Sequence, residues 1–147
     1  MTEQSRIVTA ERVIAADAAA IFELIADPAQ QPRWDGNDNL VEAPRGQRVH
    51  GVGEVFVMRI HNGEGRENHV IEFEEGRRIA WKPAPVGEEP RGHVWRWELE
   101  PTDGGTLVRH VYDWSQLTDE SRFARARATT AESLRGSIDR LAALVEG

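Results

Sequence analysis

The sequence TDESRFARARATTAESLRGSIDRLAALVEG, residues 118–147, decides how the rest of the chain folds. Apolar or β-branched side chains recur in it at steps of three, four or seven residues: Phe123, Thr130, Leu134, Ile138, Leu141 and Val145. This spacing predicts an amphipathic helix of about seven turns, with Thr118 as its N-cap. A helix with one apolar face needs a broad surface to cover, and most of the preceding chain has the alternation typical of strands.

The first half of this helix is more polar than the second and has two interpretations. In the simpler one, Arg127 lays its aliphatic stem on the edge of the sheet and keeps its charge in water. In the other, the first half covers a cavity, and Arg127 guards the entrance. Gly136 costs about 1 kcal/mol relative to alanine inside a helix, and we attribute it to a close approach to the sheet.

Composition limits the classes of function. A length of 147 residues suits one domain, residues 1–147. The absence of cysteine excludes disulfides and thiolate metal sites and is compatible with the cytoplasm, where we expect the protein. Because 25 acidic residues outnumber 18 basic ones, for a net charge of −7, we expect no nucleic-acid partner and no stable membrane association. The sequence has no apolar run long enough to span a bilayer and no signal-like start.

The order of elements predicts an α+β protein. A strand at 6–14 precedes a helix at 18–26, which Asp17 caps and Asp27-Pro28 ends. A loop or second short helix at 29–38 follows. The remaining strands are expected at 40–43, 54–61, 67–74, 78–82, 93–100 and 105–114. Short connections between them, including Asn62-Gly63 and a proline-rich loop at 83–92, make neighbouring strands antiparallel.

The hairpin around Asp103-Gly104 has a register that satisfies both faces. A two-residue turn pairs Thr102 with Gly105. On one face the expected pairs are Leu99 with Val108, Trp97 with His110, Trp95 with Tyr112 and His93 with Trp114. On the other face Glu98 lies opposite Arg109, an exposed ion pair. This register gathers aromatic side chains on one face, with Trp81 nearby.

The preceding hairpin allows two registers. A three-residue turn at 75–77 places Ile71 opposite Trp81 and Phe73 opposite Ile79. A two-residue turn places Val70 opposite Trp81 instead. We favour the first, because register follows the buried face, and it points His69, Ile71 and Phe73 inward.

Several motifs resemble the START-like superfamily with the helix-grip fold, also called SRPBCC, and most closely its polyketide cyclase/dehydrase branch. The resemblance covers essentially the whole chain. It is carried by Val13-Ile14-Ala15-Ala16-Asp17, Phe22, Ala26-Asp27-Pro28, Pro32-Arg33-Trp34-Asp35, the stretch 72–81 and the helix at 134–146. These are hinge and packing positions, and no catalytic residue is transferred with them.

The resemblance implies a curved antiparallel sheet of six to seven strands wrapped around the long C-terminal helix, with one or two short helices after the first strand. It also implies a deep hydrophobic cavity between sheet and helix. Members of the superfamily bind lipids, sterols, polyketides, hormones or quinones, and some cyclise or dehydrate polyketides.

Candidate ligand-binding residues are those expected to face this cavity: Trp34, Met58, His69, Ile71, Phe73, Trp81, Trp95, Trp97, His110, Tyr112, Trp114, Arg127 and Thr130. The aromatic residues could instead fill a plain core. His110 and Tyr112 are the candidate proton carriers of an enzyme. Asp35 and Asn37 are either turn formers or residues of the cavity entrance.

The favoured function is binding of a hydrophobic, aromatic or polycyclic small molecule, with no metal and no cofactor. His69, His93 and His110 lie on different strands without the spacing of metal ligands. The alternatives are a polyketide cyclase, aromatase or dehydratase using the same cavity, and a protein-interaction module resembling chaperone ATPase activators. Such a module should have a filled interior, whereas a binder or enzyme should contain a cavity. We expect a monomer or a homodimer.

Overall fold

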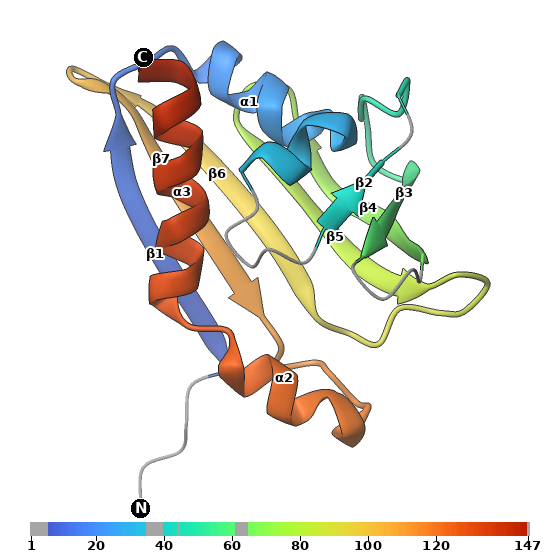
Figure 1. Ribbon diagram of the computed structural model, residues 1–147. Coiled ribbons are helices and arrows are strands. Elements are labelled where there is room, and N and C mark those ends of the chain that lie inside the picture. Colours follow the sequence, from blue (N-terminus) through green and yellow to red (C-terminus); the bar gives the residue numbers. More distant parts are fainter. Residues whose placement is uncertain (1–5, 35–39, 44, 61–64, 147) are drawn as a thin grey trace, which may run out of the picture.

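The computed structural model describes residues 6–34, 40–43, 45–60 and 65–146 (Figure 1). Its strands form one antiparallel sheet in the order β1-β7-β6-β5-β4-β3-β2. The strands are β1 (Ile7–Ile14), β2 (Leu40–Glu42), β3 (Val55–Ile60), β4 (Gly65–Glu74), β5 (Arg78–Pro85), β6 (Val94–Thr102) and β7 (Gly105–Asp113). The helices are α1 (Ala18–Ala26), η1 (Pro28–Arg33), η2 (Glu120–Arg122), α2 (Phe123–Ala128) and α3 (Ala131–Glu146). The expected turn at Asn62-Gly63 and the residues Asp35 and Asn37 lie outside the described residues.

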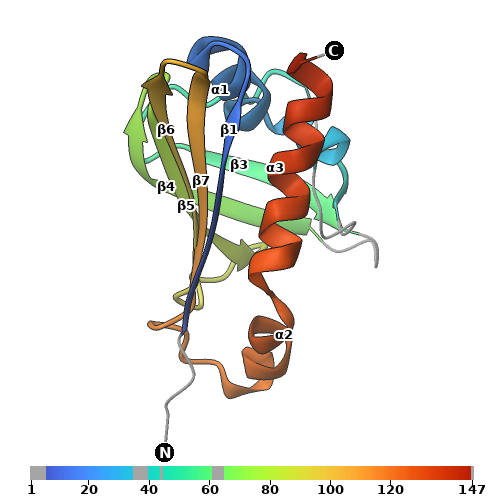
Figure 2. The ribbon, with the colours of Figure 1, turned by 90° about the vertical axis from the view of Figure 1, so that its left-hand side faces the viewer.

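The sheet curves around the helices on one side. Figure 2 shows α3 standing against this side of the sheet, with α1 near one end of α3 and α2 at the other. Helix α3 packs on β1 and β7 and buries Leu134, Ile138 and Leu141 completely. Helix α1 adds Phe22 and its neighbours to the same core. The expected α+β helix-grip arrangement is therefore confirmed.

The prediction of one continuous C-terminal helix is wrong, because the helix breaks at Thr129. Thr129 has an extended backbone, with φ −79° and ψ 112°. Thr130 then caps α3: its Oγ1 accepts from the Ser133 N–H at 3.2 Å, and its own N–H donates to Ser133 Oγ at 3.1 Å. This reciprocal pair is a capping box with serine in the place of glutamate. At the beginning of the segment, Asp119 rather than Thr118 is the cap, and its carboxylate accepts from the Ser121 N–H.

The hairpin of β6 and β7 has the expected register. Thr102 pairs with Gly105, Trp97 with His110, and Glu98 with Arg109. The ladder ends one pair earlier than expected, at Val94 opposite Asp113, so His93 and Trp114 do not form a ladder pair.

The hairpin of β4 and β5 combines the two expected registers. Phe73 pairs with Ile79, as the three-residue turn requires, but Val70 rather than Ile71 pairs with Trp81. The register shifts between Val70 and Glu72, so Ile71 is the extra residue of a β-bulge. Because the register shifts at the bulge, the residues before Ile71 lie on the opposite face from the one that the three-residue turn predicts. Asn68 and Val70 are therefore buried.

His69 lies on the outer face as a result. Its neighbours across the ladder are Val55 on β3, which is exposed, and Lys82 on β5. The expectation that His69 and Ile71 point inward is thus contradicted, because simple alternation continued through the bulge assigns them to the wrong face.

Strand β5 continues through the expected loop as far as Pro85. Residues 82–85 pair with β4, whereas β6 pairs only with residues 78–81. The carbonyl of Arg77, just before β5, accepts from the Leu99 N–H at 2.7 Å, so the backbone groups of Arg77 point toward β6. Pro83 and Pro85 lie an even number of residues further along the strand, so their backbone groups point to the same side as those of Arg77. Proline fits there because no ladder bond needs its missing N–H.

Gly136 does not approach the sheet, contrary to our expectation, because a Cβ at this position would meet no atom within 4 Å. Gly136→Ala should therefore stabilise the protein by about 0.5–1 kcal/mol, since alanine restricts the unfolded chain and favours the helix. The measurement is the urea midpoint at an unchanged m-value.

Gly105→Ala is the matched control for this substitution. Gly105 has a φ of +133°, and a Cβ there would overlap the carbonyl oxygen of Ile14. The control should be clearly destabilised. A loss of stability in Gly136→Ala as well would show that α3 does not tolerate a methyl group at residue 136.

Candidate ligand-binding site

A cavity of about 360 Å³ lies between the curved sheet, η1 and the α2 segment. This volume falls within the range of roughly 300–1,000 Å³ typical of small-molecule sites. The residues that line it come from eight elements and the loops beside them: Gln31, Trp34, Met58, Arg66, Asn68, Trp81, Pro83, His93, Trp95, Trp97, His110, Tyr112, Arg122, Arg125, Ala128 and Thr129.

Stacked rings form the sheet side of the cavity. Alternation along β6 places Trp95 and Trp97 on one face, and the register places Tyr112 and His110 opposite them. The Trp97 and His110 rings stack with centroids 3.7 Å apart and an interplanar angle of 12°. The Trp95 and Tyr112 centroids are 4.3 Å apart. Because Trp95 is only half-buried, it offers the most free aromatic surface.

The inner end of the cavity merges with the core. Trp97 is fully buried and meets Trp34 edge to face, with centroids 5.2 Å apart. The Trp34 Nε1–H donates to the Leu24 carbonyl at 2.8 Å, which fixes the ring. The Trp81 ring likewise meets the Phe56 ring edge to face, with centroids 5.3 Å apart. The aromatic side chains thus serve as core and as cavity wall together.

Three buried polar atoms of lining residues have no hydrogen-bond partner among the described residues: His93 Nδ1, Trp97 Nε1 and His110 Nδ1. Buried polar atoms are normally satisfied, and an unpaired one costs about 1–3 kcal/mol. A polar group of a molecule in the cavity would supply what these atoms lack.

Burial keeps the titratable side chains of the cavity uncharged. Desolvation, together with the positive charges of Arg122, Arg66 and Arg125, lowers the pKa of His93 to about 4. Desolvation lowers the pKa of His110 to about 3, against the opposite effect of a hydrogen bond with the backbone of Leu134. It also raises the pKa of Tyr112 to about 12. All three groups are neutral at pH 7.

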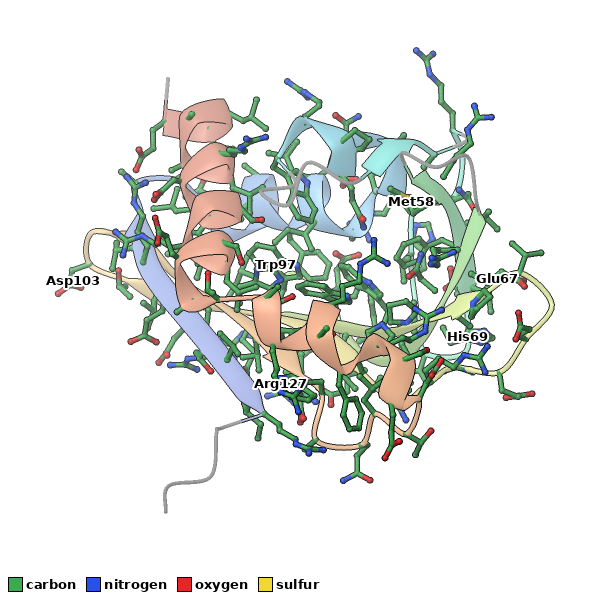
Figure 3. All side chains as sticks on the ribbon, turned by 60° about the horizontal axis from the view of Figure 1, so that its bottom comes forward. Met58, Glu67, His69, Trp97, Asp103 and Arg127 are labelled. Atoms are coloured by element: carbon green, nitrogen blue, oxygen red, sulfur yellow. The ribbon has the colours of Figure 1, made fainter. Side chains whose placement is uncertain are left out.

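The other side of the cavity carries positive charge. Arg66, Arg122 and Arg125 line it, and none of the lining residues that the structure describes is Asp or Glu. One of the two interpretations of Arg127 from the sequence placed this residue at the entrance of the cavity. Arg127 instead lies over Trp114 and Phe123, 5.8 and 5.7 Å from the ring centroids. Figure 3 shows Arg127 and Trp97 on opposite sides of the α2 ribbon.

The structure brings together seven of the thirteen candidate ligand-binding residues in this cavity: Trp34, Met58, Trp81, Trp95, Trp97, His110 and Tyr112. The other six do not line it. His69 and Ile71 are displaced by the bulge, and Thr130 is an exposed helix cap. The remaining three pack elsewhere: Phe73 against Phe22, Trp114 against Phe123, and Arg127 against Trp114.

Sequence reasoning missed several lining residues. Arg66 and Asn68 face the cavity only because the bulge changes the alternation of β4. Arg122 and Arg125 line it because the C-terminal segment bends at Thr129. The pattern Thr130-Ala131-Glu132-Ser133 was the signal for that bend, since threonine and serine three residues apart can cap each other.

Other kinds of site have less support in the described part of the chain. Its His, Asp and Glu side chains include no group of three or more that could hold a metal ion. None of the described helices is both long enough and apolar enough to cross a membrane. A second hollow, of about 220 Å³, is lined by charges that pair with each other, such as Arg78 with Glu98 at 3.7 Å.

Solved structures with the same fold are numerous. A protein of Chromobacterium violaceum matches with a TM-score of 0.68 and 19% identity, over 97% of this chain and 98% of the other. A protein of Nitrosomonas europaea matches with a TM-score of 0.69 and 16% identity, over 99% and 97%. The Aha1 dimer from Colwellia psychrerythraea matches with a TM-score of 0.66 and 18% identity, over 95% and 96%. At these identities the likeness shows the fold alone.

The sequence itself was also compared with families and with curated proteins. No curated protein matches this chain. A family model described as polyketide cyclase / dehydrase and lipid transport matches residues 5–146, which is nearly the whole length. The chain therefore belongs to the polyketide cyclase/dehydrase and lipid transport family.

Proposed function

We propose that the protein binds a planar aromatic small molecule in the cavity between the sheet and the α2 segment. The observation that carries this proposal is the wall of paired rings, Trp97 stacked on His110 and Trp95 tilted against Tyr112, facing a volume of about 360 Å³. A flat hydrophobic ligand would continue this stack and bury the free face of Trp95, and such ring pairs contribute about 0.5–1.5 kcal/mol beyond the buried area.

Polar groups of the ligand would be oriented by the buried atoms that lack partners. Trp97 Nε1 is a donor, and His93 and His110 each have an Nδ1 that no described residue pairs with. Asn68 adds an amide, although its Nδ2 already donates to the Phe56 carbonyl at 3.4 Å. A ligand with one or two oxygen atoms on a ring system fits this mixture of apolar wall and few polar contacts.

The pKa values favour binding over proton-transfer catalysis. A general base works best with a pKa near the operating pH. The pKa of His110, about 3, makes it a weak base, and the pKa of Tyr112, about 12, makes it a weak acid. If the protein is a cyclase, the cavity would act mainly by holding a folded chain in reactive geometry.

The cavity also argues against the third candidate function, a protein-interaction module. A protein-interaction module should have a filled interior, and the volume of about 360 Å³ beside Trp95 does not fit that expectation. Ligand binding is for this reason our preferred function.

Blocking the cavity from its rim tests the proposal. Ala128 lines the cavity and is exposed, so Ala128→Trp should fill the space without disturbing the core. Anthracenecarboxamide and anthracenecarboxylate are the probes, measured by isothermal titration calorimetry. We expect the wild type to bind at least one of them saturably and Ala128→Trp to weaken that binding about tenfold or more, because ring stacking and burial are lost together.

The matched control is Ala124→Trp, because Ala124 is exposed on the same helix but does not line the cavity. It should bind like the wild type. If the wild type binds neither probe, or if the two variants are weakened equally, the proposed site is wrong.

The buried histidines should also make stability depend on pH. The folded-state pKa of His110 lies below that of the unfolded chain, about 6.5, so the unfolded state binds more protons between pH 6.5 and 4. Stability is therefore complete above pH 6.5 and falls as the pH is lowered. Each such histidine contributes a slope of about 1.4 kcal/mol per pH unit in this window.

His110→Gln should reduce the slope between pH 6 and 5 by about 1.4 kcal/mol per unit. The measurement is the free energy of unfolding by urea at several pH values, and it depends on the slope rather than on the absolute stability of the variant. An unchanged slope would mean that folded His110 titrates as in the unfolded chain.

A further inference from the structure

We propose that the ligand is an acid, an aromatic ring system carrying a carboxylate, and that Arg122 and Arg125 bind the carboxylate at the rim of the cavity. This inference rests on the proposed function, because it concerns the same cavity. It adds the charge of the ligand and the residues that recognise that charge.

The charge of the cavity is opposite to that of the chain. The protein carries 25 acidic and 18 basic residues, yet the described lining residues include three arginines and no acid. Arg122 and Arg125 are three residues apart on the η2–α2 segment, a spacing that puts side chains on the same face of a helix. Arg66 approaches from β4.

Within the described part of the chain, Arg125 lacks the carboxylate partner that several other arginines have. Arg12, Arg48 and Arg96 each have a carboxylate within 3.0 Å. Arg125 has no carboxylate at ion-pair distance among the described residues. Arg122 contacts Asp119 at 3.3 Å, but that carboxylate also accepts from Ser121 and lies 3.9 Å from Arg91.

Two buried groups indicate that this charge acts inside the cavity. The positive charges of Arg122, Arg66 and Arg125 contribute to the lowered pKa of His93, and those of Arg125 and Arg122 partly oppose the rise that burial causes in the pKa of Tyr112. His93 also has a buried Nδ1 without a partner among the described residues, and its ring lies 6.0 Å from that of Tyr112. A carboxylate beside His93 would complete its hydrogen bonding and offset the arginine charges.

The distribution of groups selects an amphipathic molecule. The rings of Trp95 and Trp97 form one wall, and the arginines of the η2–α2 segment lie across the cavity from the sheet. A planar ring system would lie against the tryptophans with its acid group turned toward Arg122 and Arg125. Guanidinium groups are suited to this, because they bind carboxylates through paired hydrogen bonds.

A pair of probes that differ only in charge tests the inference. Anthracenecarboxylate and its neutral isostere anthracenecarboxamide are titrated into the protein by calorimetry. We expect the wild type to bind the acid about tenfold more tightly or better, because charge-assisted hydrogen bonds are roughly twice as strong as neutral ones. The preference should shrink as salt is added.

The arginines are tested by the double variant Arg122→Gln/Arg125→Gln, which should bind both probes with similar affinity. Arg127→Gln is the control, because it removes one positive charge from the same segment at a side chain that contacts Trp114 instead of the cavity. It should keep the preference for the acid. Circular dichroism of each variant verifies the fold.

The failures of the two proposals are distinguishable. Equal affinity of the wild type for the two probes would overturn the acid preference and leave the binding function intact. A preference that survives in the double variant would overturn the role of the arginines. If the wild type binds neither probe, the inference and the proposed function fail together.

Discussion

The register of β6 against β7 is the constraint on which the rest of the structure depends. A two-residue turn at Asp103-Gly104 sets it, and every side chain of the hairpin follows in alternation. Trp97 is thereby stacked on His110 in the core, while Glu98 pairs with Arg109 at 3.7 Å on the outer face. A slip by one residue would exchange these faces. The core contacts, the aromatic wall and the surface ion pair therefore all favour the same register.

A second constraint divides the C-terminal segment into two parts with different tasks. From Thr130 onward, α3 packs tightly on β1 and β7 through Leu134 and Ile138. Before that point, α2 turns away and leaves a space that its rim residues surround. The capping box of Thr130 and Ser133 causes the division, because it starts a new helix at this point. A continuous helix would have extended the packing against the sheet instead.

The cavity combines groups that a filled core would not accept. Its histidines stay neutral because burial removes the water that would solvate their charge, and the arginines oppose protonation of His93 further. Buried atoms such as Trp97 Nε1 have no hydrogen-bond partner in the described part of the chain. Proteins bear such costs at functional sites more often than in their cores.

Local patterns in the sequence determined the element order, the α1 helix, the β6–β7 register and the family, since a turn or an alternating strand needs only neighbouring residues. Four of the seven candidate residues that line the cavity, Trp95, Trp97, His110 and Tyr112, follow from that register. Only the tertiary structure decided the rest. The β4–β5 hairpin has one register near its turn and another beyond Ile71, and the bulge at Ile71 joins the two. The bulge brings Asn68 inward in place of His69. The break at Thr129 brings Arg125 to the cavity. A helix ends where packing against the sheet and a local cap together contribute more stability than further helical turns would.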